Sequence, residues 1–589
     1  MRREEVLRNH WFFSQEVGKE EALASDLQRE NWQTIQVPHD WSIYNDFDQY
    51  SPAQNEGGQL NGGQAWYRTQ FYLEEDASLV SVRLLFDGVY MNAQVYINGQ
   101  VLGYYPNGYT PFSYDITPYL RNDGTANQLA VFVENQQPSS RWYSGSGIYR
   151  EVKLLITDSV HLDLYGIKIE SPKLKEQRQS WVETQLTSKV SNDGPQSVSV
   201  CLEQSIWYDG QQLSDWQATD SVMIESGDKY SFQQAISIFQ PLLWDIDSPH
   251  LYQLKTRLYK NGILVDEEEE AFGYRYMDWQ ADKGFFLNGR WLKIHGVCLH
   301  HDHGSLGAVE NRSAAERRLR QMKEMGVNAI RITHNPASSI LLDVAAKMGL
   351  LIQEEAFDTW YGGKKEYDYG RFFEEEATHP EAKAGDFWSD YDLRTMIERG
   401  NNNPAIFMWS LGNEVSEANG DAHSLKTIKR LLGRVKEVDD SRFVTMGMDQ
   451  FRFGNGSGGH EKIADLLDVV GLNYSEDNID GIRKRHPKWR LYGSETSSAT
   501  RTRDSYFRPD KEWVGDNRRV RNFEQSDYGN DRVPWGKTAT TSWIADRNRL
   551  DYAGQFIWTG VDYIGEPTPW HNQNDTPVKS SYFGIVDTA

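Results

Sequence analysis

Short segments in which apolar and polar residues alternate fill the first part of the chain. VRLLFDGV, AQVYING and LAVFVEN lie within residues 1–158, and turn-forming pairs separate such segments at Asn98-Gly99 and Asp87-Gly88. An alternation with a period of two places one set of side chains on each face of a strand, and Asn-Gly and Asp-Gly favour tight turns. Residues 1–158 are therefore predicted to form a β-sandwich.

The same pattern continues over residues 159–274. The segments HLDLYGIKIE, WVETQLTSKVSN and LYQLKTRLYKNG predict strands, with a turn at Asn261-Gly262. The length is typical of an immunoglobulin-like sandwich, although the cysteine pair and central tryptophan of antibody domains are missing. Cys201 and Cys298 are far apart in the sequence and give neither a disulfide framework nor a CxxC spacing. Both are interpreted as buried thiols.

After about Tyr274 the pattern changes to strands that alternate with amphipathic helices. The segments LKIHGVC, AIRITH, LLIQEEAF, AIFMWSLGNE, FVTMG, DVVGLNY, RLYGSET and QFIWTG each predict a strand. One of the helices is predicted to start with a capping box of Ser313 and Glu316 and to stop at Gly326. Eight strands over about 300 residues are typical of a (β/α)8 barrel, which we expect over residues 275–589.

The sequence after the eighth predicted strand is short for a closing helix. About 30 residues remain there, and they include Pro567, Pro569 and Pro577, which interrupt helices. Two alternatives follow from the sequence. Either the chain is truncated at its carboxyl end, or a loop covers that side of the barrel.

Composition argues against two classes of partner. The net charge of −23 would repel a phosphate backbone, and no dense stripe of Lys and Arg offsets this charge locally. No apolar run approaches the roughly 20 residues that span a bilayer. A chain of 589 residues also exceeds what a single core supports. We therefore expect a soluble protein of several domains that binds neither nucleic acid nor a membrane.

The amino terminus, MRREEVLRNHWFF, has charged residues but neither an apolar core nor a small-residue cleavage site. A secretion signal needs both features. The sequence thus favours a cytoplasmic protein, with a signal removed at an earlier stage as the open alternative. The sequence does not determine the oligomeric state, and a homo-oligomer is one alternative.

Polar and aromatic side chains gather at the carboxyl ends of the predicted barrel strands, where the active site of such a barrel lies. These residues are His300, His334, Asn335, Asp358, Asn413, Glu414, Tyr474, Glu495 and Trp558. Glu414 ends the fourth predicted strand and Glu495 the seventh, so both should face one barrel mouth from opposing walls. Glycosidic bonds are cleaved by such pairs of carboxyl groups. The alternative for each glutamate is a structural salt bridge or a helix cap.

Several strings in this order resemble glycoside hydrolase family 2. They are VPHDW at 37–41, SSRWYSGSGIYREV at 139–152, HGVCLHHDHG at 295–304, RITHNP at 331–336, WSLGNE at 409–414, GLNY at 471–474, GSET at 493–496 and FIWTGVDYIGEP at 556–567. The resemblance covers nearly the whole chain. It implies a jelly-roll sugar-binding domain, an immunoglobulin-like sandwich and a TIM barrel, and a retaining, exo-acting hydrolase that needs no cofactor.

The resemblance also implies roles for individual residues. Glu414 matches the acid/base of the family and Glu495 its nucleophile. Asn413 matches the residue that binds the sugar 2-hydroxyl, and Tyr474 the tyrosine that hydrogen-bonds the nucleophile. The sugar subsite is implied to be lined by His300, His334 and Trp558. For Tyr474 and Trp558 the alternative is a purely structural place in the core.

Three strings, SSRWYSGSG, TMGMDQFRFG and SETSSATRTR, resemble the β-galactosidase branch. This resemblance implies a β-galactoside oligosaccharide as substrate, with Arg141 and Asp449 holding galactose hydroxyls. A salt bridge between domains is the alternative for Arg141, and a solvated loop acid is the alternative for Asp449. β-Glucuronidase is the second candidate activity, but the Asn-x-Lys pair typical of that branch is absent near KSSYFGI. A non-catalytic carbohydrate-binding protein is a third, which both retained carboxylates argue against.

The chain departs from the large lactose-cleaving β-galactosidase at its metal sites. The Mg²⁺ site of that enzyme uses a carboxylate and a histidine after the third strand, whereas this chain has EEAFDTW, with Trp360 where the histidine is needed. Ser140 replaces an acidic sodium ligand of the first domain. We therefore predict a metal-independent enzyme. A metal cluster of His300, His301 and His303 is the less favoured alternative.

Overall fold

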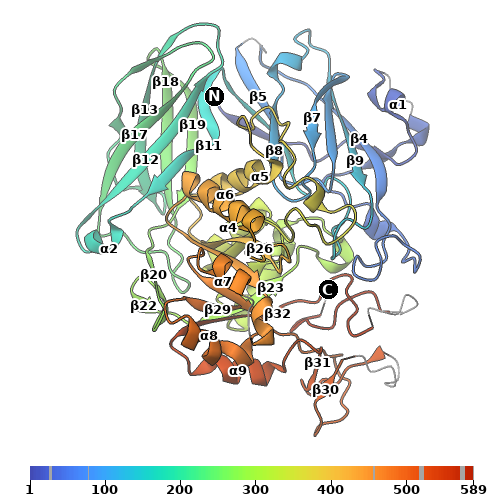
Figure 1. Ribbon diagram of the computed structural model, residues 1–589. Helices are drawn as coiled ribbons and strands as arrows, with labels where there is room; N and C mark the ends of the chain where they lie inside the picture. Colours follow the sequence, from blue (N-terminus) through green and yellow to red (C-terminus); the bar gives the residue numbers. More distant parts are fainter. Residues whose placement is uncertain (26–28, 77–78, 455–457, 516–522, 571–577, 588–589) are drawn as a thin grey trace.

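The computed structural model describes residues 1–589 apart from 26–28, 77–78, 455–457, 516–522, 571–577 and 588–589. Two β-sandwiches lie side by side at one end of the molecule, and a barrel surrounded by helices lies at the other (Figure 1). The first sandwich is blue, the second turquoise to green, and the barrel yellow-green to red. The predicted fold class, two sandwiches followed by a (β/α)8 barrel, is confirmed.

The first domain is a sandwich of two antiparallel sheets with the strand orders β1-β10-β5-β8 and β3-β2-β4-β9-β6-β7. Its strands are β1 (Arg3–Val6), β2 (Trp11–Ser14), β3 (Gln33–Ile35), β4 (Gly63–Phe71), β5 (Val80–Phe86), β6 (Ala93–Ile97), β7 (Gln100–Tyr105), β8 (Phe112–Asp115), β9 (Asn127–Asn135) and β10 (Val152–Asp158). Tyr67, Leu84 and Val131 are fully buried in its core, as expected for strands that place alternate side chains between two sheets. The turn predicted at Asn98-Gly99 joins β6 to β7, with φ of 51° and 80°.

The second predicted turn of this domain, Asp87-Gly88, does not join two paired strands. β5 belongs to one sheet and β6 to the other, so the chain crosses between sheets at this point. The Asp87 carboxylate instead accepts hydrogen bonds from the N–H and the hydroxyl of Ser339, at 3.2 and 2.5 Å. Asp is favoured both in turns and at helix starts because its short carboxylate reaches backbone N–H groups. The sequence pattern therefore did not separate these two uses.

The second domain is a sandwich of sheets ordered β11-β12-β17 and β14-β13-β18-β19, with β15 and β16 also paired to β13. Its strands are β11 (Val160–Glu170), β12 (Trp181–Asn192), β13 (Val198–Tyr208), β14 (Gln211–Gln212), β15 (Gln217–Ala218), β16 (Val222–Ile224), β17 (Lys229–Phe239), β18 (Tyr252–Lys260) and β19 (Ile263–Phe272). The predicted turn at Asn261-Gly262 joins β18 to β19. Cys298 of the barrel is a buried free thiol as predicted, whereas Cys201 is only partly buried.

Eight parallel strands form the closed barrel β23-β24-β25-β26-β27-β28-β29-β32. They are β23 (Ile294–Leu299), β24 (Ala329–Ile332), β25 (Leu351–Glu355), β26 (Ile406–Asn413), β27 (Phe443–Met448), β28 (Val470–Asn473), β29 (Leu491–Ser497) and β32 (Tyr552–Trp558). These are the eight predicted strands, in the predicted order. A small antiparallel sheet of β20 (Met277–Gln280), β21 (Gly284–Leu287) and β22 (Arg290–Trp291) precedes the barrel.

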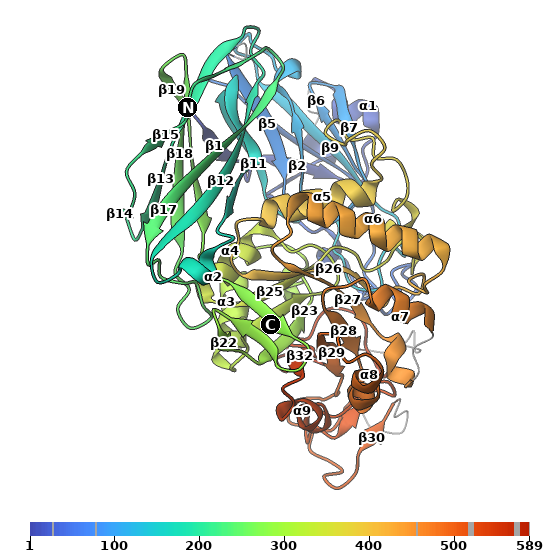
Figure 2. The ribbon, with the colours of Figure 1, turned by 60° about the vertical axis from the view of Figure 1, so that its left-hand side comes forward.

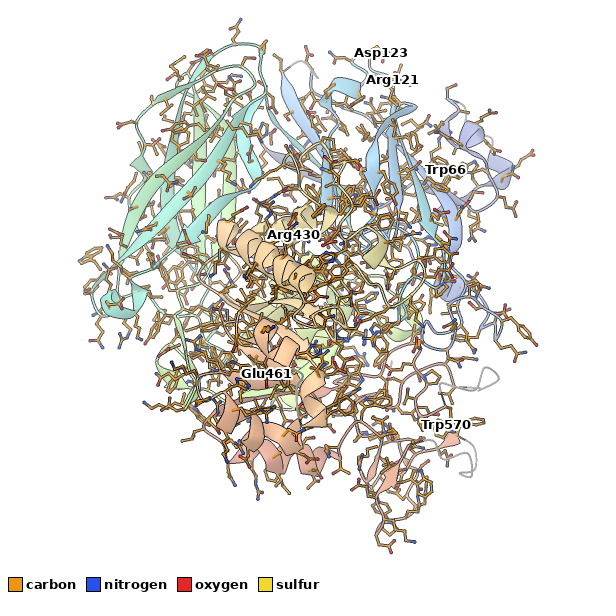
Figure 3. The ribbon with its side chains drawn as sticks, viewed as in Figure 1. Trp66, Arg121, Asp123, Arg430, Glu461 and Trp570 are labelled. Atoms are coloured by element: carbon orange, nitrogen blue, oxygen red, sulfur yellow. The ribbon has the colours of Figure 1, made fainter. Side chains whose placement is uncertain are left out.

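Helices pack around the outside of the barrel (Figure 2). They are α3 (Arg312–Glu324), α4 (Ser339–Met348), α5 (Trp388–Gly400), α6 (Ala422–Val438), α7 (Gly458–Ala464), α8 (Ile479–Arg485) and α9 (Ala539–Arg547). Arg430 of α6, labelled in Figure 3, joins α6 to α5 by donating a hydrogen bond to Asp390 at 2.5 Å. In the part of the chain that the structure describes, no helix combines the length and the apolar character needed to cross a bilayer.

The start of α3 corrects one prediction. Its N-cap is Asn311, whose side-chain oxygen accepts the N–H groups of Ser313 and Ala314 at 2.9 and 3.3 Å. Ser313 is therefore inside the helix and forms no capping box with Glu316. Asn caps a helix as well as Ser does, and here it lies two residues earlier in the chain. The helix ends before Gly326, whose φ is 90°, as predicted.

A loop follows the last barrel strand, and the described residues after β32 contain no helix. The two arms of this loop pair through the bridges Val561↔Val586 and Ile564↔Ser580. It also reaches the first domain, because the N–H of Glu566 donates a hydrogen bond to the carbonyl of Asn55 at 3.0 Å. A loop thus covers this side of the barrel.

Candidate active site

Two acidic side chains lie at the ends of barrel strands β26 and β29. β26 ends at Asn413, and Glu414 follows it with a left-handed φ of 45°, its N–H donating to the carbonyl of Gly447 at 2.8 Å. Glu495 lies in β29, which runs one residue further than the predicted segment RLYGSET. Because the strands of the barrel are parallel, both carboxyl groups lie at its carboxyl-terminal face. Glu414 and Glu495 therefore occupy the positions predicted for the carboxylate pair.

The Glu495 carboxylate is held by two hydrogen-bond donors. Arg331 donates to its Oε1 at 2.7 Å, and the hydroxyl of Tyr474 donates to its Oε2 at 2.8 Å. The Nε2 atom of His334 lies 3.6 Å from Oε1. Burial raises the pKa of Glu495 and the nearby charge of Glu414 adds to this increase, while Arg331 acts in the opposite direction. The two donors fix the orientation of both carboxylate oxygens.

The Glu414 carboxylate is more open than that of Glu495, with 19% of its side chain exposed against 4%. Asn473 donates to its Oε1 at 3.1 Å, and a guanidinium nitrogen of Arg141 lies 3.8 Å from its Oε2. Burial acts to raise the pKa of Glu414, but the charges of Arg141 and Lys364 outweigh it and hold the pKa below its ordinary value. The less restrained carboxyl group of the pair thus faces the more positive surroundings.

Two adjacent residues of β28 and the loop after it connect the carboxyl groups. Asn473 contacts Glu414, and Tyr474, the next residue, contacts Glu495. The amide group of Asn473 also donates to the Oδ1 atom of Asn413 at 3.2 Å. The resemblance to the family predicted the contact of Tyr474, whereas nothing in the sequence distinguished Asn473, its neighbour in GLNY. One pair of neighbouring side chains thus brings both carboxylates to a shared site.

A fully buried guanidinium group lies beneath this site. Arg331 makes a bidentate ion pair with Glu355 at 2.9 to 3.0 Å, and it donates to the Oδ1 atom of Asn413 at 2.9 Å. Glu355 also lies 2.7 Å from the Nδ1 atom of His334. Arg331 thus links Glu495 to the residue before Glu414. No role was predicted for Arg331 from the sequence. A charged residue inside an apolar strand is nevertheless a signal, because such a charge is seldom buried without a partner.

Arg331→Met is expected to destabilise the barrel by about 3 to 5 kcal/mol, because it leaves the buried carboxylates of Glu355 and Glu495 without their cation. Urea unfolding followed by tryptophan fluorescence measures this loss. Arg312→Met is the matched control, since Arg312 pairs with Asp343 at 2.7 Å on the surface and should contribute only about 0 to 1 kcal/mol. An equal loss in the two variants would contradict the structural role of Arg331.

Aromatic rings form one wall of the site. Trp558 stacks on His334, with ring centres 5.4 Å apart and planes within 5° of parallel. His300 meets Trp558 edge-on at 5.3 Å, and burial lowers the pKa of His300 well below its ordinary value, so its ring is neutral. Its Nε2 atom is buried and has no hydrogen-bond partner among the described residues. Trp142 of the first domain, which was not predicted to be a site residue, completes the wall. Its ring centre lies 5.8 Å from that of Trp558.

Arg141 reaches the barrel from the first domain. It donates to Asp358 at 3.1 and 3.4 Å, and its guanidinium group lies 4.7 Å from the ring centre of Trp142. The salt bridge between domains that the sequence left as an alternative is therefore present. Arg141 also lies beside Glu414, at the distance given above, so this salt bridge is part of the site.

Asp449 follows β27, and its Oδ2 atom lies 3.3 Å from a guanidinium nitrogen of Arg452. Burial and the charge of Glu414 raise its pKa to about 6. Because it follows a barrel strand, Asp449 lies at the same face of the barrel as the carboxylate pair, but no hydrogen bond joins it to Glu414 or Glu495 in the described structure. Among the predicted site residues, Arg141, His334 and Tyr474 have a direct polar contact with one of the two carboxylates. The described structure gives no such contact for His300, Asn413, Asp449 and Trp558.

A further carboxyl group, that of Glu566, lies at the edge of the site and was not predicted from the sequence. Glu566 is held by its backbone to the first domain, and its side chain accepts a short hydrogen bond from the hydroxyl of Tyr563. Burial raises the pKa of Glu566 to about 8, against the opposing charge of Arg141. Glu566 stands in FIWTGVDYIGEP, where the sequence Gly-Glu-Pro is typical of a loop and gives no signal of a chemical role.

The histidine-rich loop after β23 does not gather its rings around one point. His301 lies 3.2 Å from the carbonyl of Ser144, whereas His303 lies 3.2 Å from Glu310. Among the described residues, no group of three or more His, Cys, Asp or Glu side chains is placed to hold a metal ion. The indole N–H of Trp360 donates to the carbonyl of Leu411 at 2.9 Å. A metal-independent enzyme remains a prediction.

Three family models match the chain in sequence order. The sugar binding domain of glycosyl hydrolases family 2 matches residues 5–158, a second domain described as glycosyl hydrolases family 2 matches 165–275, and the TIM barrel domain of that family matches 280–577. Together these matches cover most of the sequence.

Individual relatives are also similar over long stretches. A β-galactosidase of Bacteroides ovatus is 39% identical over 598 aligned residues, covering 95% of this chain and 67% of that protein. A β-glucuronidase of Bacteroides fragilis is 28% identical, covering 76% and 61%. The crystal structure of a glycosyl hydrolase family 2 member from Bacteroides cellulosilyticus has a TM-score of 0.82 at 31% identity, covering 96% and 65%. The chain thus spans 61% to 67% of the length of these relatives.

Proposed function

The chain belongs to glycoside hydrolase family 2, and from this we propose that it hydrolyses terminal β-D-galactosides with retention of configuration. The observation that carries the proposal is the pair of carboxyl groups at one barrel face. Glu495 is buried and fixed by Arg331 and Tyr474, whereas Glu414 is partly open. A fixed carboxylate suits a nucleophile, and an accessible carboxyl group suits an acid that must meet both a leaving group and water.

In the first step of the proposed mechanism, a Glu495 oxygen attacks the anomeric carbon while Glu414 gives its proton to the glycosidic oxygen. The bond from carbon to oxygen breaks, and the leaving group departs as an alcohol. In the second step, Glu414 takes a proton from a water molecule, and the oxygen of that water attacks the anomeric carbon. Glu495 then leaves as a carboxylate, and the sugar is released with its original configuration.

The pKa shifts describe the protein without a sugar. In that state the pKa of Glu414 is lowered and that of Glu495 raised, which is the reverse of the order that an acid and a nucleophile need. The roles are therefore assigned from the hydrogen bonds and the exposure. A sugar bound at the site removes water from Glu414, and this desolvation raises the pKa of Glu414 toward the range of a general acid.

Galactose as the sugar is supported by the β-galactosidase relative at 39% identity and by the position of Asp449 near Glu414. A carboxylate can accept hydrogen bonds from two sugar hydroxyls and so distinguish an axial from an equatorial 4-hydroxyl. β-Glucuronidase is the second candidate, supported by the relative at 28% identity. A glucuronide carboxylate needs a cation, but Arg141 and Lys364 both already pair with Asp358, at 3.1 and 2.9 Å. The geometry thus favours a neutral sugar.

A panel of 4-nitrophenyl β-galactoside, β-glucuronide, β-glucoside and β-mannoside at one pH tests the proposal. We expect kcat/KM for the galactoside to exceed the others by about 100-fold or more, since a mismatched hydroxyl leaves a buried polar group unpaired. NMR during the reaction should show the β-anomer of the free sugar first. Preference for the glucuronide would reject galactose, and initial release of the α-anomer would reject retention. Failure of all four substrates would favour a non-catalytic carbohydrate-binding protein.

A further inference from the structure

A lysine from the loop after β25 places its ammonium group next to the end of β26. The Nζ atom of Lys364 donates hydrogen bonds to the Oδ1 atom of Asp358 at 2.9 Å and to the backbone carbonyl of Asn413 at 2.7 Å. Asn413 is the residue directly before Glu414. Only 15% of the Lys364 side chain is exposed. Burial of an ammonium group costs hydration free energy, and the two oxygen partners of Lys364 offset this cost.

The backbone around Lys364 is fixed. The carboxylate of Asp368 accepts the N–H groups of Lys364 and Lys365, at 2.5 and 2.8 Å. Two residues before Lys364, the N–H of Gly362 donates to Glu417 at 2.7 Å, and Glu417 lies three residues after Glu414 in the chain. The loop is thus tied to the segment that carries Glu414, and the ammonium group is held in place before any substrate binds.

We propose that Lys364 is a positioning residue, whose ammonium group holds the end of β26 and supplies a fixed positive charge beside the Glu414 carboxyl group. This inference rests on the proposed function, because it concerns Glu414 as the acid and base of that reaction.

The positive charge of Lys364 matters most in the second step of the proposed mechanism. There Glu414 must be ionised in order to take a proton from water, and a cation nearby stabilises its anionic form. Lys364 is the second cation that lowers the pKa of Glu414, after Arg141. Burial and the charge of Arg141 lower the pKa of Lys364 itself, whereas the charges of Asp358 and Glu414 oppose this decrease. Asp358 thus keeps two cations next to one carboxyl group.

Other charged groups also face Glu414 and enter its titration. Glu495 lies across the site on β29, and its carboxyl group interacts electrostatically with Glu414. His334, after β24, favours the anion of Glu414, and Asp449, after β27, shares a repulsive interaction with it. Substitution of Lys364 leaves all of these groups in place. A change in the pH dependence on substitution therefore reports the charge of Lys364.

The test compares Lys364→Met, Lys364→Gln and Lys364→Arg in the full chain, with kcat/KM measured against pH on the best aryl glycoside. Loss of a cation raises the pKa of a neighbouring carboxyl group, and one limb of kcat/KM follows the ionisation of Glu414 in the free enzyme. We expect this limb to move to higher pH in the Met and Gln variants. At neutral pH these variants should also lose about 10- to 100-fold in kcat, because the base of the second step is misplaced. Lys364→Arg should keep the limb of the wild type.

Lys365→Met is the matched control, since Lys365 is the next residue and pairs with Glu56 at 2.5 Å. Its limb should not move. An unshifted limb in both neutral Lys364 variants, or the same shift in Lys365→Met, would overturn the inference. Lys364→Gln retains a hydrogen-bond donor and so decides the question even where Lys364→Met does not fold. A wild-type protein that hydrolyses no aryl glycoside would instead reject the proposed function, and the role of Lys364 with it.

Discussion

Glu495→Ala is expected to lower kcat on aryl β-galactosides by about 10⁴- to 10⁶-fold, the range seen when an enzyme loses its nucleophile. Without this carboxylate no covalent intermediate forms, and the oxygens that Arg331 and Tyr474 now hold are missing. Steady-state kinetics measure the loss. Sodium azide offers a sharper readout, because the small anion can enter the space left by the carboxylate and attack the anomeric carbon from that side. The product should then be the α-glycosyl azide.

Glu461→Ala is the control for this variant. Glu461, labelled in Figure 3, lies on α7 outside the barrel and pairs with His486 at 3.0 Å. Removing it deletes a carboxylate from a surface ion pair, and activity should stay close to that of the wild type. Residual activity of Glu495→Ala within about tenfold of this control would contradict the assignment of Glu495 as nucleophile.

Glu414→Ala is expected to lower kcat by about 10²- to 10⁴-fold on substrates with poor leaving groups, because no acid protonates the departing oxygen. A 2,4-dinitrophenyl leaving group needs little protonation, so formation of the covalent intermediate should remain fast with it. The second step then lacks its base, and the sugar-bound enzyme should accumulate and be visible by mass spectrometry. Comparison of leaving groups over a range of acidity measures this difference.

The azide product separates the two roles. In Glu414→Ala, azide attacks the covalent intermediate from the side opposite Glu495, so the product should be the β-glycosyl azide. A β-product from Glu495→Ala together with an α-product from Glu414→Ala would reverse the two assignments. An equal loss on all leaving groups in Glu414→Ala, with no accumulated intermediate, would remove Glu414 as acid and base.

The eight barrel strands and their order could be predicted because their apolar residues are close together in the sequence. Burial of one continuous segment such as AIFMWSLGNE depends on local composition, which can be read without knowing its neighbours. The same reasoning placed Glu414 at the end of β26 and Glu495 in β29. It failed where one residue type serves two local purposes, as at Asp87, and where two nearby residues can both cap a helix, as at Asn311 and Ser313.

The contacts of the site could not be predicted in this way. Arg331 and Glu495 are 164 positions apart, and Arg141 and Asp358 are 217 positions apart. No periodicity relates such residues, since their meeting depends on the closure of the barrel and on how the first domain packs against it. Lys364 and Glu566 were missed for a related reason. They lie on loops, where hydrophobic pattern carries little information and the backbone path decides where the side chain points.

The sequence by itself determined the elements, the order of the domain types and the two carboxyl groups, because each follows from local pattern or from short strings that resemble one family. Only the tertiary structure decided which cationic side chain pairs with which carboxylate. Arg331 could have paired with any of several acids, and closure of the barrel brought it to Glu355 and Glu495. The pKa of a carboxyl group depends on charges and water within a few ångströms, and those distances exist only once the chain is folded.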